Sequence, residues 1–331
     1  MVALVTDYCK HGDINEFIER NHKSPQQFRK YRDSWNKKTT DKPMFVLFET
    51  TSKCNLRCTM CVQSVGYEQT ERMQDQLFLK SIKEISDLRI PAVAMNQINE
   101  PLLDKKIYDK IKIVSEVDSV VDIHMNTNAV LLNRSNSEKI LNSNLTRLLL
   151  GFDGYSKDVF EKVRDRAKYD QVFNNIINFL ELKKKMKKIF PVTRISFVKT
   201  SDNEHEIPNW YNFWKDKIDY LTIQEFISPV SDHSKSHLIP KSSKRLKTDP
   251  ASIICTQPSE RMTIRGDGDV IPCCSHIALK MPMGNLYKNS IKEIWNNKKF
   301  VDLRKTLTKP GGYKKYKICK QCIETSYNLK K

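Results

Sequence analysis

The chain has 331 residues, of which 39% are hydrophobic and 29% are charged, a globular composition long enough for one large α/β domain plus a small one. The start, MVALVTDYCKHGD, lacks the charged and then apolar pattern of a signal peptide. No stretch approaches the roughly 20 apolar residues of a membrane span. We therefore expect a cytoplasmic protein with no membrane span, in which clustered cysteines more often bind metal than form disulfides.

The formal net charge is +18, a surplus that can indicate nucleic acid, an anionic membrane surface or an acidic substrate. The basic residues are spread over three runs, Lys183–Lys188, Lys241–Lys247 and Lys314–Lys317. No nucleic-acid motif accompanies these runs, so we expect solvated basic faces and no nucleic-acid partner. The surplus would also suit a phosphorylated or nucleotide-linked sugar.

Residues 1–43 predict an N-terminal helical extension with helices at Asp13–His22 and Ser24–Lys38. Asp13 and Ser24 are natural N-caps, and Pro25 fits the first helical turn.

Residues 44–235 alternate between strand and helix patterns. Strands are expected at Met44–Thr51, Ala92–Gln97, Val121–Asn128, Arg147–Gly154, Thr193–Thr200 and Tyr220–Ser228. Helices are expected at Asp75–Leu88, Asp104–Val117, Asn136–Ser143, Lys157–Arg164, Tyr169–Met186 and Glu206–Ile218. Six strands alternating with helices predict an α/β fold with a parallel sheet, either a barrel or an open sheet.

The composition changes to Ser, Lys and Pro around residues 228–250, and we assign residues 236–250 to a linker or mobile surface loop. Residues 251–331 then form a short, cysteine-rich region. Within it, Thr263–Cys273 predicts a β-hairpin whose GDGD turn supplies glycine for positive φ, and Ser290–Leu307 predicts a helix.

The stretch TSKCNLRCTMC, Thr51–Cys61, contains three cysteines, too few for a closed zinc site and one too many for a disulfide. A four-iron cluster has four irons that each need an outside ligand, usually a cysteine thiolate. The spacing Cys54-x3-Cys58-x2-Cys61 lets one loop hold three irons and leaves the fourth open. The loop follows a predicted strand, which would place it at the carboxyl end of the sheet, where α/β barrels build their sites. A zinc loop or three unrelated buried thiols are the alternatives.

This C-x3-C-x2-C loop after the first strand resembles the radical S-adenosylmethionine (SAM) superfamily. The resemblance implies a partial (β/α)6 TIM-like barrel and a 4Fe–4S cluster held by Cys54, Cys58 and Cys61, with SAM on the open iron. It also implies that an electron, supplied by a reductant such as flavodoxin or ferredoxin, cleaves SAM to a 5′-deoxyadenosyl radical. That radical abstracts hydrogen from a substrate.

The resemblance extends to two later strand ends. INEPLLD, Ile98–Asp104, matches the family's Gly-Gly-Glu-Pro segment at Glu100 and Pro101, while Ile98 and Asn99 replace the glycines. The resemblance makes Asn99 and Glu100 candidates for the SAM amino group. HMNTNAVLL resembles the Thr-Asn-Gly segment that faces the SAM ribose, which makes Asn126 and Asn128 candidates.

Three further site residues follow from the same resemblance. GFDGYSKDVFEKVR looks like a frequent Asp-Gly-to-Arg stretch of the family and places Asp153 near the active site, with a turn residue as the alternative. Arg194 would meet the carboxylate of SAM or of the substrate, unless it is a surface arginine. Met60 would pack near the adenine.

The C-terminal region holds a second cysteine set, in which Cys255, Cys273, Cys319 and Cys322 could complete a four-thiolate site for zinc or an iron–sulfur cluster. Its phrases GDGDVIPCC and CKQC resemble the SPASM extension of radical SAM enzymes in its shortened, single-cluster twitch form. The resemblance implies an auxiliary 4Fe–4S cluster. The cysteine spacing is close to that of aminocyclitol dehydrogenases such as 2-deoxy-scyllo-inosamine dehydrogenase.

An auxiliary cluster can accept the electron that a carbinol radical must lose to become a ketone, so we expect oxidation of an alcohol in a sugar or aminocyclitol. One alternative is epimerisation with Cys274 as hydrogen donor, unless Cys274 is only a packed thiol; Cys9 is the other spare thiol. A second is modification of a ribosomal peptide. The third is a non-enzymatic zinc protein that binds nucleic acid.

Overall fold

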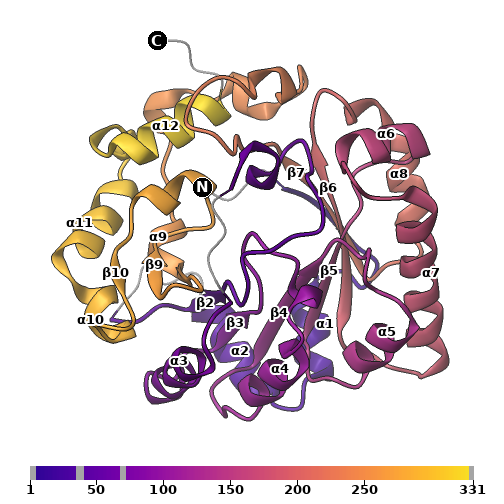
Figure 1. Cartoon of the computed structure of the whole chain (residues 1–331), viewed down its shortest axis with the longest axis horizontal. Coiled ribbons are helices and arrows are strands. Elements are labelled where there is room, and N and C mark those ends of the chain that lie inside the picture. Colours follow the sequence, from indigo (N-terminus) through magenta and orange to yellow (C-terminus); the bar gives the residue numbers. More distant parts are fainter. Residues whose placement is uncertain (1–4, 35–40, 68–71, 328–331) are drawn as a thin grey trace.

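A computed structural model describes residues 5–34, 41–67 and 72–327 (Figure 1). The strands of this part form one sheet in the order β1-β7-β6-β5-β4-β3-β2-β8-β9-β10. Their bounds are β1 Val5–Cys9, β2 Phe45–Phe48, β3 Ala92–Ala94, β4 Asp122–Thr127, β5 Arg147–Gly151, β6 Val192–Lys199, β7 Tyr220–Glu225, β8 Arg261–Ile264, β9 Asp269–Ile271 and β10 Gly284–Asn285.

Strands β2 to β7 lie side by side in chain order and pair in parallel. The helices between them cover the outer face of the curved sheet (Figure 1). They are α3 Asp75–Asp87, α4 Ile107–Ser115, α5 Arg134–Leu141, α6 Lys157–Val163, α7 Tyr169–Lys185 and α8 Ile207–Trp214. This arrangement confirms the expected partial (β/α)6 fold. Several strands end earlier than predicted, because the residues that follow turn away into loops.

The amino ends of the strands are closed by the N-terminal segment, whose helices are α1 Ile14–Asn21 and α2 Pro25–Ser34. Asp13 caps α1 as predicted, since its Oδ1 accepts the N–H groups of Asn15 and Glu16 at 2.7 and 2.9 Å. Buried residues of both helices pack on the first residues of four strands: Ile18, Phe28, Tyr31, Phe45, Ala92, Val192 and Tyr220. The sequence did not predict β1, which pairs antiparallel with β7. The carboxyl ends of the strands therefore remain for a site.

The C-terminal region extends the same sheet. Strand β8 pairs in parallel with β2, and β9 and β10 follow antiparallel. The predicted hairpin is confirmed, with Gly268 at φ 84° in its turn. The helices here are α9 Gln257–Glu260, α10 Ile291–Asn296, α11 Lys298–Leu307 and α12 Lys317–Ser326. The prediction of one helix from Ser290 to Leu307 was wrong, because Asn297 is extended and its side chain caps α11 by accepting the Phe300 N–H at 2.8 Å.

The segment assigned to a linker forms three short 3-10 turns at Ser236–Leu238, Lys244–Lys247 and Pro250–Ser252. It buries Leu238, Ser243 and Arg245 almost completely. The segment is therefore anchored in the protein at these three side chains.

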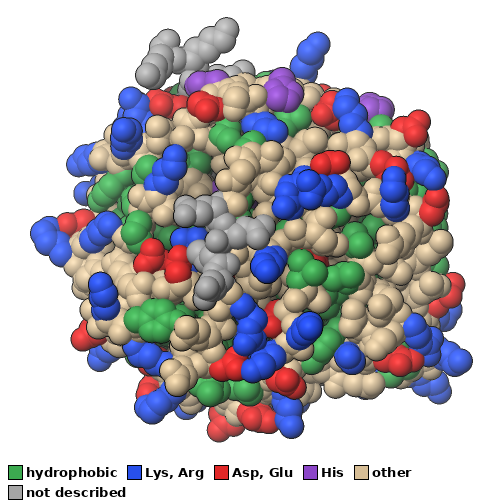
Figure 2. Space-filling view, in the orientation of Figure 1, with side chains coloured by type: hydrophobic (Ala, Val, Ile, Leu, Met, Phe, Trp, Pro, Cys, Tyr) green, Lys and Arg blue, Asp and Glu red, His purple; other side chains and the backbone are tan. Residues whose placement is uncertain are grey.

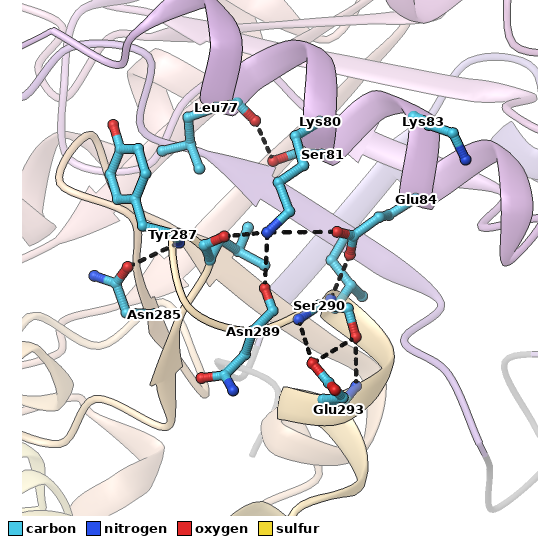
Figure 3. A network of polar contacts seen from close by, with 12 residues as sticks. Leu77, Lys80, Ser81, Lys83, Glu84, Asn285, Tyr287, Asn289, Ser290 and Glu293 are labelled. Carbon is cyan, nitrogen blue, oxygen red and sulfur yellow. Dashed lines mark hydrogen bonds and ion pairs between the residues drawn. The ribbon is translucent and has the colours of Figure 1, made fainter.

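A polar network joins helix α3 of the barrel to the C-terminal region (Figure 3). Lys80 Nζ donates to the carbonyl oxygens of Leu286 and Asn289, and Glu84 Oε2 accepts the Ile291 N–H at 2.5 Å. Ile291 begins α10, so the Glu84 carboxylate lies at a helix N-terminus, where negative charge is favourable. These contacts and the β2–β8 pairing hold the two regions together.

On the face shown in Figure 2, lysine and arginine side chains are distributed among acidic ones. Two members of the basic runs are nevertheless buried, Lys183 and Arg245, so the expectation that these runs are solvated was wrong at those positions. Among the described residues, no helix combines the length and apolar character needed to cross a bilayer.

Candidate active site

The three-cysteine loop lies at the carboxyl end of β2. The chain leaves the strand at Glu49, whose N–H donates to the carbonyl of Ile264 at 2.9 Å. Cys58 and Cys61 are joined by a tight turn in which the Cys61 N–H donates to the Cys58 carbonyl at 2.9 Å. The Sγ of Cys54 accepts the N–H of Leu56 at 3.5 Å. One folded loop thus carries all three thiols.

The three cysteines are half-buried, and loss of contact with water raises the pKa of Cys58 to about 12, of Cys61 to about 11 and of Cys54 above its ordinary value. The positive charge of Arg164 acts in the opposite direction on all three. A cation at the loop would deprotonate such thiols outright. The donor set therefore fits a tri-thiolate metal cluster.

Arg164 follows α6 and forms a buried ion pair with Asp153. Its Nε and Nη2 both lie 2.7 Å from Asp153 Oδ2, and Asp153 Oδ1 accepts the Val198 N–H at 2.6 Å. Gly151 gives the guanidinium its space, because a Cβ there would lie 2.2 Å from Arg164 Nη2. Both oxygens of Asp153 are engaged, so the geometry favours a positioning role for this residue over direct catalysis.

Glu100 is fully buried and connects the ends of β3 and β4. Its Oε1 accepts Thr127 Oγ1 at 2.8 Å and the Leu102 N–H at 3.1 Å, and its Oε2 accepts the Asn128 N–H at 2.7 Å. Burial raises the pKa of Glu100 to about 7, although the three hydrogen bonds that its carboxylate accepts act to lower this pKa. Glu100 thus organises the loop backbone, and any contact with SAM stays a proposal.

Asn128 lies beside the cysteine loop. Its Nδ2 donates to Asn55 Oδ1 at 2.8 Å and lies 3.8 Å from Cys54 Sγ. The structure therefore brings Asn128 and Cys54 together, as expected for one site.

Asn99 and Asn126 offer unengaged side-chain groups. The buried Nδ2 of Asn99 has no hydrogen-bond partner in the described part of the chain, while its Oδ1 accepts the Gln97 N–H at 2.9 Å. Asn126 is exposed although β4 is a central strand whose neighbour Met125 packs in the main core. Alternate residues of a strand point to opposite faces, so Asn126 faces an open barrel interior.

Arg194 and Met60 make fewer specific contacts than the residues above. The Arg194 guanidinium lies 6.0 Å from the ring centroid of Tyr220, an interior residue, and its buried Nε has no partner among the described residues. Arg194 is the third residue of β6 and pairs with Tyr220, the first residue of β7, so it lies near the amino ends of the strands and away from the cysteine loop at the carboxyl ends. Met60 is half-buried in the turn between Cys58 and Cys61. The contacts expected of both with SAM remain predictions.

The second cysteine set lines one cavity of about 210 Å³. Its lining includes Cys255, Cys273, Cys274, Cys319 and Cys322. Burial raises the pKa of Cys319 to about 12 and the pKa values of Cys273 and Cys322 above the ordinary value. In residues 5–34, 41–67 and 72–327, no three His, Cys, Asp or Glu side chains converge tightly enough for one metal ion. Four thiolates around one cavity suit either zinc or an iron–sulfur cluster.

The two spare thiols lie in different places. Cys274 is exposed, and its carbonyl accepts Gln97 Nε2 of the barrel at 3.3 Å, two residues before Asn99. Cys9 ends β1 and pairs with Tyr220, the first residue of β7, so it lies at the amino end of the barrel. Cys274, and not Cys9, is near the expected site.

A partial parallel barrel with three clustered cysteines after its first parallel strand, joined to a second cysteine cavity, defines an iron–sulfur enzyme of the α/β barrel class. Residues 48–213 match the Radical SAM superfamily, and residues 255–323 match SPASM, an iron–sulfur cluster-binding domain. The chain belongs to the radical SAM superfamily. Its cofactors are a SAM-binding 4Fe–4S cluster, SAM and an auxiliary iron–sulfur cluster. The alternative of a non-enzymatic zinc protein is therefore not retained.

Two relatives of known function catalyse different reactions. The chain is 25% identical over 283 residues to a GTP 3′,8-cyclase of Clostridium botulinum, covering 73% of this chain and 85% of the relative. It is 24% identical over 280 residues to the S-adenosyl-L-methionine-dependent 2-deoxy-scyllo-inosamine dehydrogenase of Niallia circulans, covering 84% and 92%. The solved structure of BtrN in complex with AdoMet and 2-DOIA has a TM-score of 0.56 at 21% identity, over 85% of this chain and 92% of that one.

Sequence reasoning missed two buried arginines, Arg164 and Arg245. Arg164 is the last residue of the GFDGYSKDVFEKVR stretch, so the motif that drew attention to Asp153 already contained its partner. Arg245 lies in a basic run interpreted as solvated, and no local pattern distinguishes it there.

Proposed function

We propose that this radical SAM enzyme oxidises a secondary alcohol of a sugar or aminocyclitol to a ketone. The observation that carries the proposal is the hydrogen bond from Gln97 to the Cys274 carbonyl, which joins the auxiliary cysteines to the loop that holds Asn99. A group that accepts electrons in the cysteine cavity would then lie beside the substrate space. The near full-length similarity to an aminocyclitol dehydrogenase supports the same reaction class.

In this proposal, Cys54, Cys58 and Cys61 hold the SAM-binding cluster. The auxiliary cluster is assigned to Cys255, Cys273, Cys319 and Cys322. When bound, these cofactors supply a carbon radical that removes hydrogen and an acceptor for one electron. The alcohol loses a hydrogen atom from carbon, then one electron and its hydroxyl proton, and ends as a ketone.

In this proposal, side chains of the barrel bind SAM and orient it. The amide oxygen of Asn99 supplies an acceptor toward the SAM amino group, and the exposed Asn126 faces the ribose. Met60 supplies an apolar surface for the adenine. Holding the C–H bond against the reacting carbon accounts for a large part of such catalysis. We also propose the boundaries 44–235 for the core, 236–250 for the linker and 251–331 for the auxiliary domain, with 1–43 as the closing extension.

The test uses anaerobically reconstituted protein, SAM, a reductant of the flavodoxin or ferredoxin type, and a panel of cyclitols and sugars deuterated at single carbinol carbons. Deuterium transfer into 5′-deoxyadenosine together with one ketone per SAM consumed is the expected result. GTP is the comparison substrate, because GTP 3′,8-cyclases are among the relatives. A cyclised nucleotide, and no ketone from any alcohol, would refute the proposal.

Epimerisation of a sugar or peptide is the second candidate, because Cys274 is exposed and is not needed for the proposed quartet. In deuterated water, epimerisation incorporates solvent deuterium at carbon through the thiol, whereas oxidation yields a carbonyl. A Cys274→Ala variant that still forms 5′-deoxyadenosine but loses that incorporation would favour the epimerase; unchanged ketone formation favours the dehydrogenase.

A further inference from the structure

Arg245 is fully buried and has no carboxylate partner among the residues that the structure describes. It is 1% exposed, and one of its nitrogens, Nη1, donates to the carbonyl of Phe226. Its Nε and Nη2 are buried and have no hydrogen-bond partner in the part of the chain that the structure describes. Glu225, whose charge acts on Arg245, is already engaged by Lys199 at 2.8 Å and by Ser243 at 2.5 Å.

The guanidinium lies between two segments that approach the auxiliary cysteine cavity. On one side is the chain after β7, where Phe226 accepts its hydrogen bond and the next residue, Ile227, lines the cavity. On the other side is α12, because the guanidinium lies 5.3 Å from the ring centroid of Tyr327, which ends that helix. The N–H of Ser228 donates to Ser326 Oγ at 3.2 Å and ties the two segments together.

Helix α12 also carries two cysteines of the cavity, Cys319 and Cys322. Burial lowers the pKa of Arg245, and the nearby Tyr327, Glu225 and Cys322 act against that effect. Arg245 therefore packs against the end of the helix that carries two of the cavity cysteines.

A buried positive charge without a compensating anion is costly, since the desolvation of a guanidinium is not repaid by one backbone carbonyl. A cluster with four thiolate ligands is negatively charged and becomes more negative when it accepts an electron. Buried positive charge and N–H groups nearby stabilise the reduced form and raise the reduction potential. Charge complementarity therefore explains why an arginine is buried here.

We propose that Arg245 acts on the auxiliary cluster through its fixed positive charge. This charge raises the reduction potential of the cluster and so favours acceptance of the substrate electron. The inference rests on the proposed function, in which four cysteines, Cys255, Cys273, Cys319 and Cys322, hold the auxiliary cluster. It adds a residue from the 236–250 segment to the catalytic apparatus, although that segment contributes no cysteine.

The test is an anaerobic redox titration followed by electron paramagnetic resonance. The full chain is used with Cys54, Cys58 and Cys61 changed to alanine, so that only the auxiliary cluster is observed. Arg245→Met removes the charge, and Arg245→Lys keeps it. The matched control is Arg304→Met. Arg304 is also buried, lies 4.1 Å from the Trp295 ring centroid and donates to a backbone carbonyl, but within the described residues it makes no hydrogen bond to a cysteine.

We expect Arg245→Met to shift the midpoint potential to a more negative value, with Arg245→Lys and Arg304→Met close to the parent. Loss of iron in Arg245→Met, with iron retained in the other two variants, supports the same charge requirement. An unchanged midpoint in Arg245→Met overturns the inference, and so does loss of iron in both Arg245 variants when Arg304→Met retains it. Ketone formation by the unaltered enzyme is measured separately, so failure of the proposed function is distinguishable from failure of this inference.

Discussion

Replacing Asp153 with Asn tests whether its carboxylate positions Arg164 or takes part in chemistry. Asp153 is completely buried, and its Oδ2 compensates a guanidinium that is itself about nine-tenths buried. Breaking a buried ion pair by removing one partner leaves an unpaired charge and typically costs about 3–5 kcal/mol. We expect Asp153→Asn to lower the free energy of unfolding of the cofactor-free protein by about that amount.

A double-mutant cycle with Arg164→Met makes the test specific. The double variant removes both charges, so it should lose clearly less stability than the sum of the two single variants. Gly151→Ala is a matched perturbation that leaves both charges present but displaces the guanidinium, and it should resemble Asp153→Asn. Urea unfolding followed by circular dichroism gives the values. Single effects that add within about 0.5 kcal/mol would refute the coupling. Full stability of Asp153→Asn with lost activity would restore a catalytic role.

Three further predictions concern other parts of the molecule. Lys80→Met removes the hydrogen bonds to the carbonyls of Leu286 and Asn289 and should cost about 1 kcal/mol and increase proteolysis between the regions; an unchanged urea midpoint would contradict this. Burial raises the pKa of Glu100 from 4.5 to about 7, so the folded protein holds a proton that the unfolded chain releases in that window. Stability should therefore fall as pH rises from about 4.5 to 7, by about 3 kcal/mol, and Glu100→Gln should flatten this dependence; parallel pH profiles would count against it. Cys319→Ser should reduce bound iron from about eight to about four atoms per chain, and retention of all the iron would exclude Cys319 as a ligand.

The barrel was predictable because its signals are local. Strand and helix patterns alternate from β2 to α8, so the parallel α/β class followed from alternation, while the partial barrel followed from the family resemblance. The cysteine loop was predictable because Cys54, Cys58 and Cys61 are adjacent in sequence and directly follow a strand.

The unpredicted features depend on contacts between distant residues. Strand β1 becomes a strand only because β7 offers it an edge, and its own sequence carries no strong pattern. The break at Asn297 depends on one side chain that caps the next helix, where the flanking residues continue a helical pattern. Arg245 looked solvated in a basic run, and only packing against Tyr327 and Phe226 buries it.

Radical chemistry in this protein requires that Cys54, Cys58 and Cys61 hold a cluster with one iron open to SAM. The direct measurement is electron paramagnetic resonance of the reduced protein, with and without SAM, in a Cys319→Ser, Cys322→Ser background that lacks the auxiliary cluster. We predict the signal of a reduced four-iron cluster that changes on adding SAM and disappears in a further Cys58→Ser variant. A spectrum that SAM leaves unchanged, or iron that survives the loss of Cys58, would contradict the assignment.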